Sequence, residues 1–385
     1  MKNTTLQRYH ESFADTLGGN AAFAFWKGRV ALYAILRAMG IKEGDEVIMP
    51  GYTCVMAVNP IIYLGAKPVF VDIDPDTYNM DPNQIESKIS ARTRMIIAQH
   101  TYGIPADMDA ILDIGKRKSI SVIEDCCLSM GSTIRGKKTG TFGEAAYFSF
   151  QWNKPYTSGL GGMALTCNEN LAQRIGDLWE NATVEPSFKQ VNLLRLQLMV
   201  YRSLIYPKTT ALAQETFRTL NKWGLVVGSS QGSELTPKME PDFFKRMSTM
   251  QARAGLRQLD RVAANLTHRR KMREIYDRLC CENGLALPKI SPDADPVLVR
   301  YPVRVADKAT ALRKASSHFV ELGSWFECPL HPIETPMSAY GYHEGMCPEA
   351  DKACREVVNL PCHPRASEST AKRSVAFLGK ISDAK

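Results

Sequence analysis

"GDEVIMPGYTCVMAVNPIIYLGAKPVFVDID", residues 44–74, decides the fold of this chain. Residues 44–50 open from a turn into an apolar run, and residues 57–66 have the pattern of a short helix. Residues 67–74 form a second apolar run that ends in acids. Runs that are apolar on both faces are typical of buried parallel strands, which need a crossover segment between them. The stretch therefore predicts a strand, a helix and a parallel strand.

Further apolar runs of the same kind follow. Residues 93–100 (TRMIIAQH), 119–125 (SISVIED) and 145–150 (AAYFSF) are predicted strands, and the spacers are long enough for crossover helices. This pattern predicts an α/β fold with a mainly parallel central sheet flanked by helices. Residues 1–255 are expected to form this large domain. Residues 256–385, which begin with a long helical pattern, are expected to form a smaller α+β domain.

Composition limits the class of protein. The 385 residues are 44% hydrophobic and 23% charged, which fits a globular protein with a large core. No apolar run approaches the roughly 20 residues of a membrane span, and the start lacks a signal-peptide core, so we expect a cytoplasmic protein. Ten cysteines without CxxC spacing predict reduced thiols and no metal site. A net charge of +8, spread along the chain, favours a small anionic ligand over nucleic acid.

Polar residues follow the predicted strands. His100, Asp125 and Lys154 all lie just after strand ends, where ligands bind in open α/β sheets. Lys154 stands between an aromatic run and a glycine cluster in "FSFQWNKPYTSGLGGM", residues 148–163. The ordinary alternatives are a solvated surface lysine and, for Asp125, a helix N-cap or turn residue. The three together predict one shared crevice.

A helix start adds a phosphate site. In "FWKGRVALYAILRAMG", residues 25–40, a glycine leads into an amphipathic helix. The amides of Gly28, Arg29 and Val30 would form its first turn, where the helix dipole favours a phosphate, although any helix start resembles this one. A lysine for a Schiff base, an aspartate for a pyridinium nitrogen and a helix start for a phosphate are what pyridoxal phosphate needs.

The sequence resembles the DegT/StrS family of pyridoxal-phosphate-dependent aminotransferases, most of which act on nucleotide-linked keto sugars. The resemblance runs from about residue 20 to 180 and from about 245 to 385. It is carried by the order and spacing of residues 44–82, "QHTYGIPADMD" (99–109), "VIEDCCLSMG" (122–131) and "YFSFQWNKPYTSGLGGM" (147–163). It implies the fold-type I aminotransferase architecture.

The resemblance also implies residue roles. Lys154 matches the Schiff-base lysine, Asp125 the partner of the pyridinium nitrogen and Ser149 a contact of the cofactor phosphate. The turn at Gly28, Arg29 and Val30 matches the family's phosphate turn, with Arg29 on the cofactor phosphate, on the diphosphate of the substrate, or pointing to solvent.

Other matched positions surround the cofactor ring or the substrate. Cys54 stands where the family has a ring-stacking aromatic, and Tyr52 or Trp152 would supply a replacement face. Leu128 stands where a polar contact to the phenolic oxygen is usual, and Phe244 where an asparagine reaches across the dimer. The expected substrate contacts are His100, Tyr102 and His331.

The resemblance implies a homodimeric aminotransferase that moves an amino group from an amino acid, expected to be glutamate, to a nucleotide-linked keto sugar. Such reactions serve surface-polysaccharide or secondary-metabolite sugar biosynthesis. A non-sugar acceptor is one alternative. A non-catalytic regulatory protein on a degenerate aminotransferase scaffold is another, suggested by Leu128 and Phe244 and disfavoured by the retained Lys154 and Asp125.

Residues 188–240 depart from the resemblance as an insertion. Within them, residues 192–206 are apolar nearly all round a helix. Such a helix is expected to be buried inside its own subunit or the dimer, and the alternative is an interfacial helix on a membrane or a partner.

Overall fold

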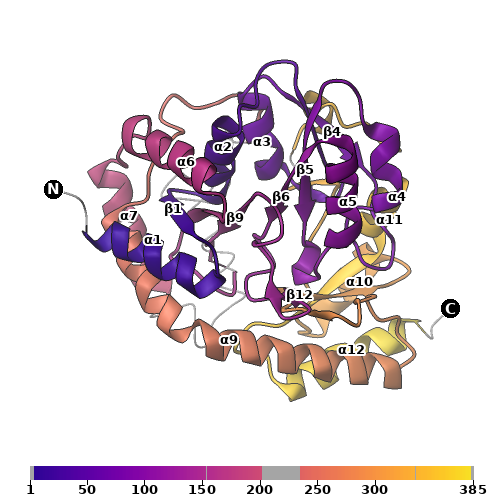
Figure 1. Cartoon of the computed structure of the whole chain (residues 1–385). Helices are drawn as coiled ribbons and strands as arrows, with labels where there is room; N and C mark the ends of the chain where they lie inside the picture. Colours follow the sequence, from indigo (N-terminus) through magenta and orange to yellow (C-terminus); the bar gives the residue numbers. More distant parts are fainter. Residues whose placement is uncertain (1–3, 153, 202–234, 334, 383–385) are drawn as a thin grey trace.

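The computed structural model describes residues 4–152, 154–201, 235–333 and 335–382 (Figure 1). Its central seven-stranded sheet has the order β1-β10-β9-β6-β5-β2-β4. The neighbours from β9 to β4 are parallel, and β10 runs antiparallel to both β1 and β9. This arrangement confirms the predicted α/β fold with a mainly parallel sheet.

The strands of this sheet are β1 (Ala21–Phe25), β2 (Glu46–Pro50), β4 (Lys67–Val71), β5 (Thr93–Gln99), β6 (Ser121–Asp125), β9 (Ala145–Ser149) and β10 (Gly162–Thr166). The others are β3 (Thr53–Cys54), β7 (Thr133–Ile134), β8 (Lys137–Lys138), β11 (Ala294–Asp295), β12 (Arg300–Arg304), β13 (Leu330–His331) and β14 (Val357–Pro361). The described α-helices are α1 (Thr4–Leu17), α2 (Gly28–Ala38), α3 (Val55–Tyr63), α4 (Pro82–Ile85), α5 (Met108–Lys118), α6 (Glu169–Asn181), α7 (Phe188–Val200), α9 (Thr249–Glu282), α10 (Lys308–Ser317), α11 (Pro348–Glu356) and α12 (Glu368–Ser382).

Strands β1 and β10 escape the apolar pattern that identifies the others. Their sequences, AAFAF and GMALT, are rich in small residues and hold a single β-branched residue, Thr166. Small residues suit this edge of the sheet because α2 packs closely on β9 and β10. At this edge the backbones of Gly28, Ser149 and Gly162 approach one another closely, and this approach places the start of α2 at the candidate site.

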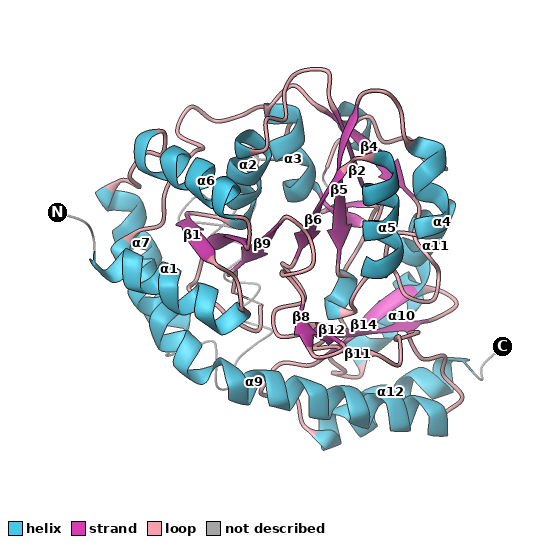
Figure 2. Cartoon of the chain, viewed as in Figure 1, coloured by secondary structure: helices cyan, strands magenta, loops and turns pink. Residues whose placement is uncertain are grey.

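Helices cover both faces of the sheet (Figure 2). Apolar residues of α2, α3 and α6 share one core cluster with alternate residues of β5, β6 and β9. The opposite face of the same strands packs against α1 and α5. Because side chains alternate along a strand, consecutive residues of β6 serve different faces.

The 34-residue helix α9 connects the central sheet with the C-terminal part of the chain. It begins with a capping box, in which the Ser248 hydroxyl accepts from the Gln251 amide and the Gln251 side chain accepts from the Ser248 amide. It packs against α1 and α12, and the antiparallel pair β12–β14 lies beside α10. The predicted domain boundary at residues 255 and 256 falls inside α9, and the division into two domains stays a prediction.

Helix α7 is less buried than its composition suggests. Leu194 and Leu198 are buried, whereas Leu196, Met199 and Val200 are between 41% and 54% exposed. The rest of the predicted helix 192–206, from residue 202, and most of the insertion lie outside the described residues. Within the described part of the chain, no helix is both long enough and apolar enough to cross a membrane.

Candidate functional site

The site lies at the carboxyl end of β6. Asp125, the last residue of this strand, is 6% exposed. Its Oδ1 atom accepts a hydrogen bond from the Cys127 amide at 2.9 Å, and its Oδ2 atom accepts one from the Tyr147 hydroxyl at 2.5 Å. Burial raises the pKa of Tyr147 well above its ordinary value, which keeps this hydroxyl protonated as a donor. The carboxylate is therefore fixed in one orientation.

Lys154 lies in a loop between β9 and β10 that α9 holds in place. The Asn265 side chain of α9 donates to the Pro155 carbonyl at 2.6 Å, and the Gln251 side chain donates to the Leu160 carbonyl at 2.9 Å. Within the loop, the Lys154 amide donates to the Gln151 carbonyl at 3.0 Å. The position of the lysine therefore depends on a helix far along the chain.

The Lys154 ammonium is half-buried beside an aromatic ring. Its Nζ atom lies 4.8 Å from the centroid of the Trp325 ring. Burial lowers the pKa of Lys154, and the charge of Arg300 acts in the same direction, while Asp125 opposes it. A lowered pKa favours the neutral amine, which is the form that acts as a nucleophile or a base.

Three backbone segments meet at the start of α2. A Cβ atom on Gly162 would come within 2.5 Å of the Gly28 Cα, and one on Gly28 within 2.9 Å of the Ser149 Cβ. The first amides of a helix have no intrahelical partner, so the Gly28 end of α2 and the Ser149 hydroxyl form a cradle suited to a phosphate. The amide of Val30 donates to the Lys27 carbonyl at 3.1 Å, and a phosphate contact from this residue stays a prediction.

Arg29 points into the protein. It is 6% exposed, and its guanidinium contacts the Met56 sulfur at the start of α3. It also affects the pKa of Cys54 electrostatically. The alternative of a solvent-directed arginine is therefore wrong, whereas a phosphate contact stays a prediction.

Strand pairing brings His331 to the site. The parallel pair β3–β13 aligns His331 with Cys54, a thiol that is electrostatically coupled to Lys154 and Asp125. The His331 ring lies 6.2 Å from the Trp325 ring. This location keeps His331 as a candidate substrate contact and Cys54 as a candidate cofactor contact.

Tyr52 and Tyr102 are buried residues that hold Trp325 in place through hydrogen bonds. Both are fully buried, the Tyr52 hydroxyl donates to the Tyr102 hydroxyl at 2.6 Å, and the Tyr102 hydroxyl donates to the Trp325 carbonyl at 2.7 Å. Rings without exposed surface have no face to offer a ligand, so the predicted ligand contacts of these two residues are wrong. Their hydroxyls instead fix Trp325. Leu128 is buried in the core cluster, and its contact with the cofactor stays a prediction.

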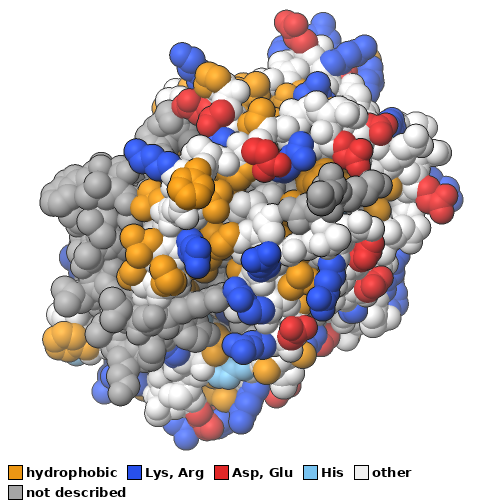
Figure 3. Space-filling view, turned by 90° about the vertical axis from the view of Figure 1, so that its left-hand side faces the viewer, with side chains coloured by type: hydrophobic (Ala, Val, Ile, Leu, Met, Phe, Trp, Pro, Cys, Tyr) orange, Lys and Arg blue, Asp and Glu red, His pale blue; other side chains and the backbone are white. Residues whose placement is uncertain are grey.

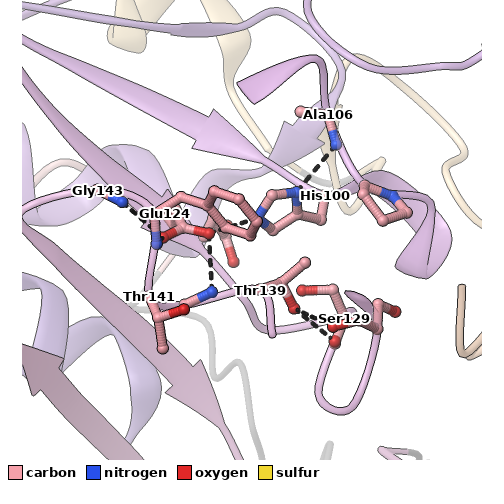
Figure 4. A network of polar contacts seen from close by, with 12 residues as sticks. His100, Ala106, Glu124, Ser129, Thr139, Thr141 and Gly143 are labelled. Atoms are coloured by element: carbon pink, nitrogen blue, oxygen red, sulfur yellow. Dashed lines mark hydrogen bonds and ion pairs between the residues drawn. The ribbon is translucent and has the colours of Figure 1, made fainter. Parts of the chain in front are cut away.

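His100 belongs to a buried polar network on the other face of the sheet (Figure 4). Its Nδ1 atom accepts from the Ala106 amide at 3.0 Å, so Nε2 carries the proton and donates to Glu124 at 3.1 Å. The Glu124 carboxylate also accepts from the amides of Gly140, Phe142 and Gly143. Both ring nitrogens are used, so the prediction of His100 as a substrate contact is wrong.

The same network explains a cluster of potential metal ligands. His100, Glu124 and Cys126 offer ligand atoms within 4.8 Å of one another. The hydrogen bonds that hold His100 and Glu124 use up the lone pairs that a cation would need. Burial also raises the pKa of the Cys126 thiol, which disfavours the thiolate. The cluster is a structural unit that shapes residues 139–143.

Two residues of the site escaped the sequence analysis. Trp325 lies six residues before His331, and Arg300 lies in the apolar run of residues 296–305, which has the pattern of an ordinary strand. No local pattern marks either residue, since only tertiary structure brings them beside Lys154. Phe244, where an asparagine was expected from the resemblance, packs against Phe25 and Tyr33 of its own chain.

These residues fit pyridoxal phosphate. Asp125 presents a fixed carboxylate for a ring nitrogen, Lys154 an amine of lowered pKa for the aldehyde carbon, and the cradle of Gly28 and Ser149 the donors for a phosphate. All three features lie on the sheet face covered by α2, at one end of the strands. The donor set therefore matches the three polar groups of the cofactor.

Comparison with known proteins agrees with this site. A model of the DegT/DnrJ/EryC1/StrS aminotransferase family matches residues 2–194 and 209–378. The GDP-perosamine synthase of Caulobacter vibrioides is 31% identical over 377 residues, which cover 97% of this chain and 89% of that protein. The UDP-2-acetamido-2-deoxy-3-oxo-D-glucuronate aminotransferase of Pseudomonas aeruginosa is 28% identical over 369 residues, covering 96% and 88%.

A solved structure shares the fold. NtdA from Bacillus subtilis, described with bound cofactor PMP, superposes with a TM-score of 0.76 at 24% identity, covering 98% of this chain and 77% of that one. At this identity the likeness concerns the fold, and it supports the fold-type I architecture.

Proposed function

The chain belongs to the DegT/DnrJ/EryC1/StrS aminotransferase family, and from this premise we propose that it is a pyridoxal-phosphate-dependent enzyme that places an amino group on a keto sugar. The observation that carries this proposal is the convergence of Lys154, Asp125 and the cradle of Gly28 and Ser149 at one end of the sheet. The amino donor is an amino acid, expected to be glutamate.

Each residue has a defined task. Bound pyridoxal phosphate supplies the carbonyl group that accepts an amine and the ring that withdraws electrons from the carbon being deprotonated. Lys154 removes the proton from the donor carbon as a base and returns it as an acid. Asp125, fixed by Tyr147 and the Cys127 amide, keeps positive charge at the ring nitrogen. Gly28 and Ser149 hold the phosphate.

The acceptor is proposed from the relatives. One relative is named for a GDP-linked amino sugar and another for a UDP-linked keto sugar acid, at similar identity to this chain. A nucleotide-linked keto sugar is the class that these names share, with a role in polysaccharide or secondary-metabolite biosynthesis. The two relatives are named for different nucleotides, GDP and UDP, so experiment must identify the nucleotide of the acceptor.

The first test separates an enzyme from a non-catalytic scaffold. The protein loaded with pyridoxal phosphate is mixed with glutamate, and formation of 2-oxoglutarate and pyridoxamine phosphate is measured. Both products are expected at one per site. A protein that binds the cofactor without forming them would support the regulatory alternative. A panel of nucleotide-linked keto sugars, followed by mass spectrometry for the amine, then identifies the acceptor.

The working unit is proposed to be a homodimer. Exposed apolar residues on α7, among them Leu196 and Met199, support a protein contact on this side of the molecule. Figure 3 views that side and shows apolar side chains gathered beside lysines and arginines. Light scattering of the purified protein is expected to give twice the mass of the chain, and a monomer at micromolar concentration would contradict the proposal.

A further inference from the structure

Helix α1 has no role in the proposed reaction, yet it packs against segments that carry the candidate site. It lies beside α9 and the end of β9 (Figure 1). Its inward residues Tyr9 and Phe13 are both 0% exposed. These two side chains connect the helix to the phosphate cradle and to the lysine loop, which is the segment of residues 150–161 between β9 and β10 that holds Lys154.

Phe13 packs beside the phosphate cradle. Its ring centroid lies 5.2 Å from that of Phe148 and 5.4 Å from that of Phe150, the two residues on either side of Ser149. Because side chains alternate along a strand, these two rings face α1 while Ser149 faces the start of α2. Aromatic pairs have preferred geometries and contribute more than the area that they bury. Contact with α1 therefore helps to fix the strand end that presents the Ser149 hydroxyl.

Tyr9 holds the lysine loop through a hydrogen bond between two buried phenols. The hydroxyl of Tyr156, two residues after Lys154, donates to the Tyr9 hydroxyl at 2.7 Å. Tyr156 is 1% exposed, and burial raises the pKa of both phenols well above the ordinary value, so both hydroxyls keep their protons. A buried hydroxyl that loses its partner still carries the cost of its desolvation. The bond therefore favours one position of the loop.

Gly255 of α9 lies where α1, α9 and the lysine loop meet. A Cβ atom at this position would lie 2.6 Å from the Tyr9 Cζ atom and 2.7 Å from the Tyr156 hydroxyl oxygen. Both distances are too short for a carbon contact, so a side chain at this position would push the two phenols away. Glycine thus allows the three segments to pack this closely. Interiors packed to this density transmit displacements, so the loop does not shift without moving α1.

We propose that α1 positions Lys154 for the cofactor through Tyr9 and Tyr156, so that docking of α1 and binding of pyridoxal phosphate stabilise each other. A docked α1 restrains the lysine loop and the strand end at Ser149 before the cofactor binds. A cofactor held by Lys154 and Ser149 restrains the same two segments. Coupling of this kind is reciprocal in free energy. The inference rests on the proposed function, since it requires a cofactor at Lys154.

Two matched variants test the hydrogen bond. Tyr156→Phe removes the donor and keeps the ring, and Tyr342→Phe removes another buried hydroxyl, which donates to Asp351 at 3.2 Å in the C-terminal part of the chain. Titration of each cofactor-free protein gives the dissociation constant of pyridoxal phosphate. We expect Tyr156→Phe to raise this constant about three- to tenfold and Tyr342→Phe to leave it unchanged. Tyr9→Phe should raise it by a similar factor, and the double variant with Tyr156→Phe by no more than either single variant, because both substitutions remove the same bond.

Hydrogen exchange tests the coupling in the opposite direction. Addition of pyridoxal phosphate to the wild type is expected to slow amide exchange in α1 about three- to tenfold more than in α12, which packs against the same helix α9. A cofactor that merely stabilised the whole fold would slow exchange in both helices equally. In Tyr156→Phe the additional protection of α1 should be smaller than in the wild type.

A measurement without cofactor separates the inference from the proposed function. Labelling of the cofactor-free protein with acetic anhydride at a series of pH values gives the pKa of Lys154, which burial lowers. Tyr156→Phe should raise this pKa toward 10.5, because a loosened loop lets water reach the ammonium, and Tyr342→Phe should not. A wild type that binds no pyridoxal phosphate would contradict the proposed function, while the pKa comparison would still decide whether the bond positions the lysine.

Three results would each overturn the inference. The first is a Tyr156→Phe variant that matches the wild type in both the dissociation constant and the pKa of Lys154. The second is an equal change in Tyr156→Phe and Tyr342→Phe, which would indicate a general loss of stability. The third is an equal slowing of exchange in α1 and α12 when the cofactor binds.

Discussion

Glu124 and Asp125 are consecutive residues of β6, and their carboxylates serve opposite faces of the sheet. Glu124 accepts hydrogen bonds from His100 and from three backbone amides, and Asp125 accepts from Tyr147 and the Cys127 amide in the site. One carboxylate thus shapes a loop, and its neighbour faces the candidate site. Substitutions at the two positions are expected to affect different properties.

Glu124→Gln should destabilise the protein by roughly 2 to 4 kcal/mol, because an amide group would turn an N–H donor toward backbone donors and leave them unpaired. Urea unfolding measures the change. Glu144→Gln, at an exposed position close by, is the control and should change stability little. Unchanged stability in Glu124→Gln would contradict the structural role of the network.

Asp125→Asn should leave the fold intact and lower the rate of the glutamate half-reaction by orders of magnitude. An amide does not stabilise a protonated ring nitrogen as a carboxylate does. Circular dichroism checks the fold and stopped-flow absorbance the rate. A variant with a rate near that of the wild type would contradict the proposed role of Asp125 at the ring nitrogen.

Lys154 is expected to carry the cofactor covalently. Borohydride reduction followed by peptide mapping should place a pyridoxyl group on Lys154, and Lys154→Ala should lose both the adduct and the visible absorbance of the bound cofactor. An adduct found on another lysine would refute the assignment.

The lowered pKa of Lys154 should appear in the stability of the cofactor-free protein. Its folded-state pKa lies below the ordinary value of 10.5, so between these two values the unfolded chain holds the extra proton and stability rises with pH. Lys154→Met lacks this group and should be more stable than the wild type at pH 7, by a margin that shrinks as the pH approaches 10.5. Urea unfolding between pH 7 and 10.5 measures the margin, and a constant margin would contradict the lowered pKa.

Arg29→Thr should weaken retention of pyridoxal phosphate about ten- to a hundredfold if the guanidinium supplies charge-assisted hydrogen bonds to the phosphate. Titration of the cofactor-free protein measures the dissociation constant. Arg37→Thr, at an exposed position in the last turn of the same helix, is the control. Equal constants for wild type and Arg29→Thr would rule out the phosphate role, and a rise confined to the acceptor's KM would indicate a contact with the acceptor.

The sequence predicts most of the strands of the sheet and the position of Asp125 and Lys154 after strand ends, because both depend on local order. Buried parallel strands are continuous apolar runs, and residues such as Asp125 and Lys154 follow them at the edge where ligands bind. The assignments that failed depend on facing and burial. His100 follows a strand as Asp125 does, but its ring lies on the other face, a choice that the apolar pattern of a two-sided strand does not reveal.

Arg300 and Trp325 show the other limit of the sequence. Each lies in a segment whose local pattern is that of an ordinary strand or loop. The centroid of the Trp325 ring lies 4.8 Å from the Lys154 Nζ atom and 5.8 Å from the Arg300 guanidinium. Such a distance is set by the packing of α9 and by the pairing of β3 with β13. The spacing of residues within either segment does not predict these distances.

The pairing of Cys54 with His331 has a consequence for synthesis on the ribosome. Cys54 emerges from the ribosome long before His331, yet the two residues are paired side by side in one wall of the candidate site. The central sheet is complete once residue 166 has emerged, long before this wall exists. The nascent chain therefore presents an open half-site, and tight binding of the cofactor is expected only after the segment that holds His331 has emerged and paired with β3.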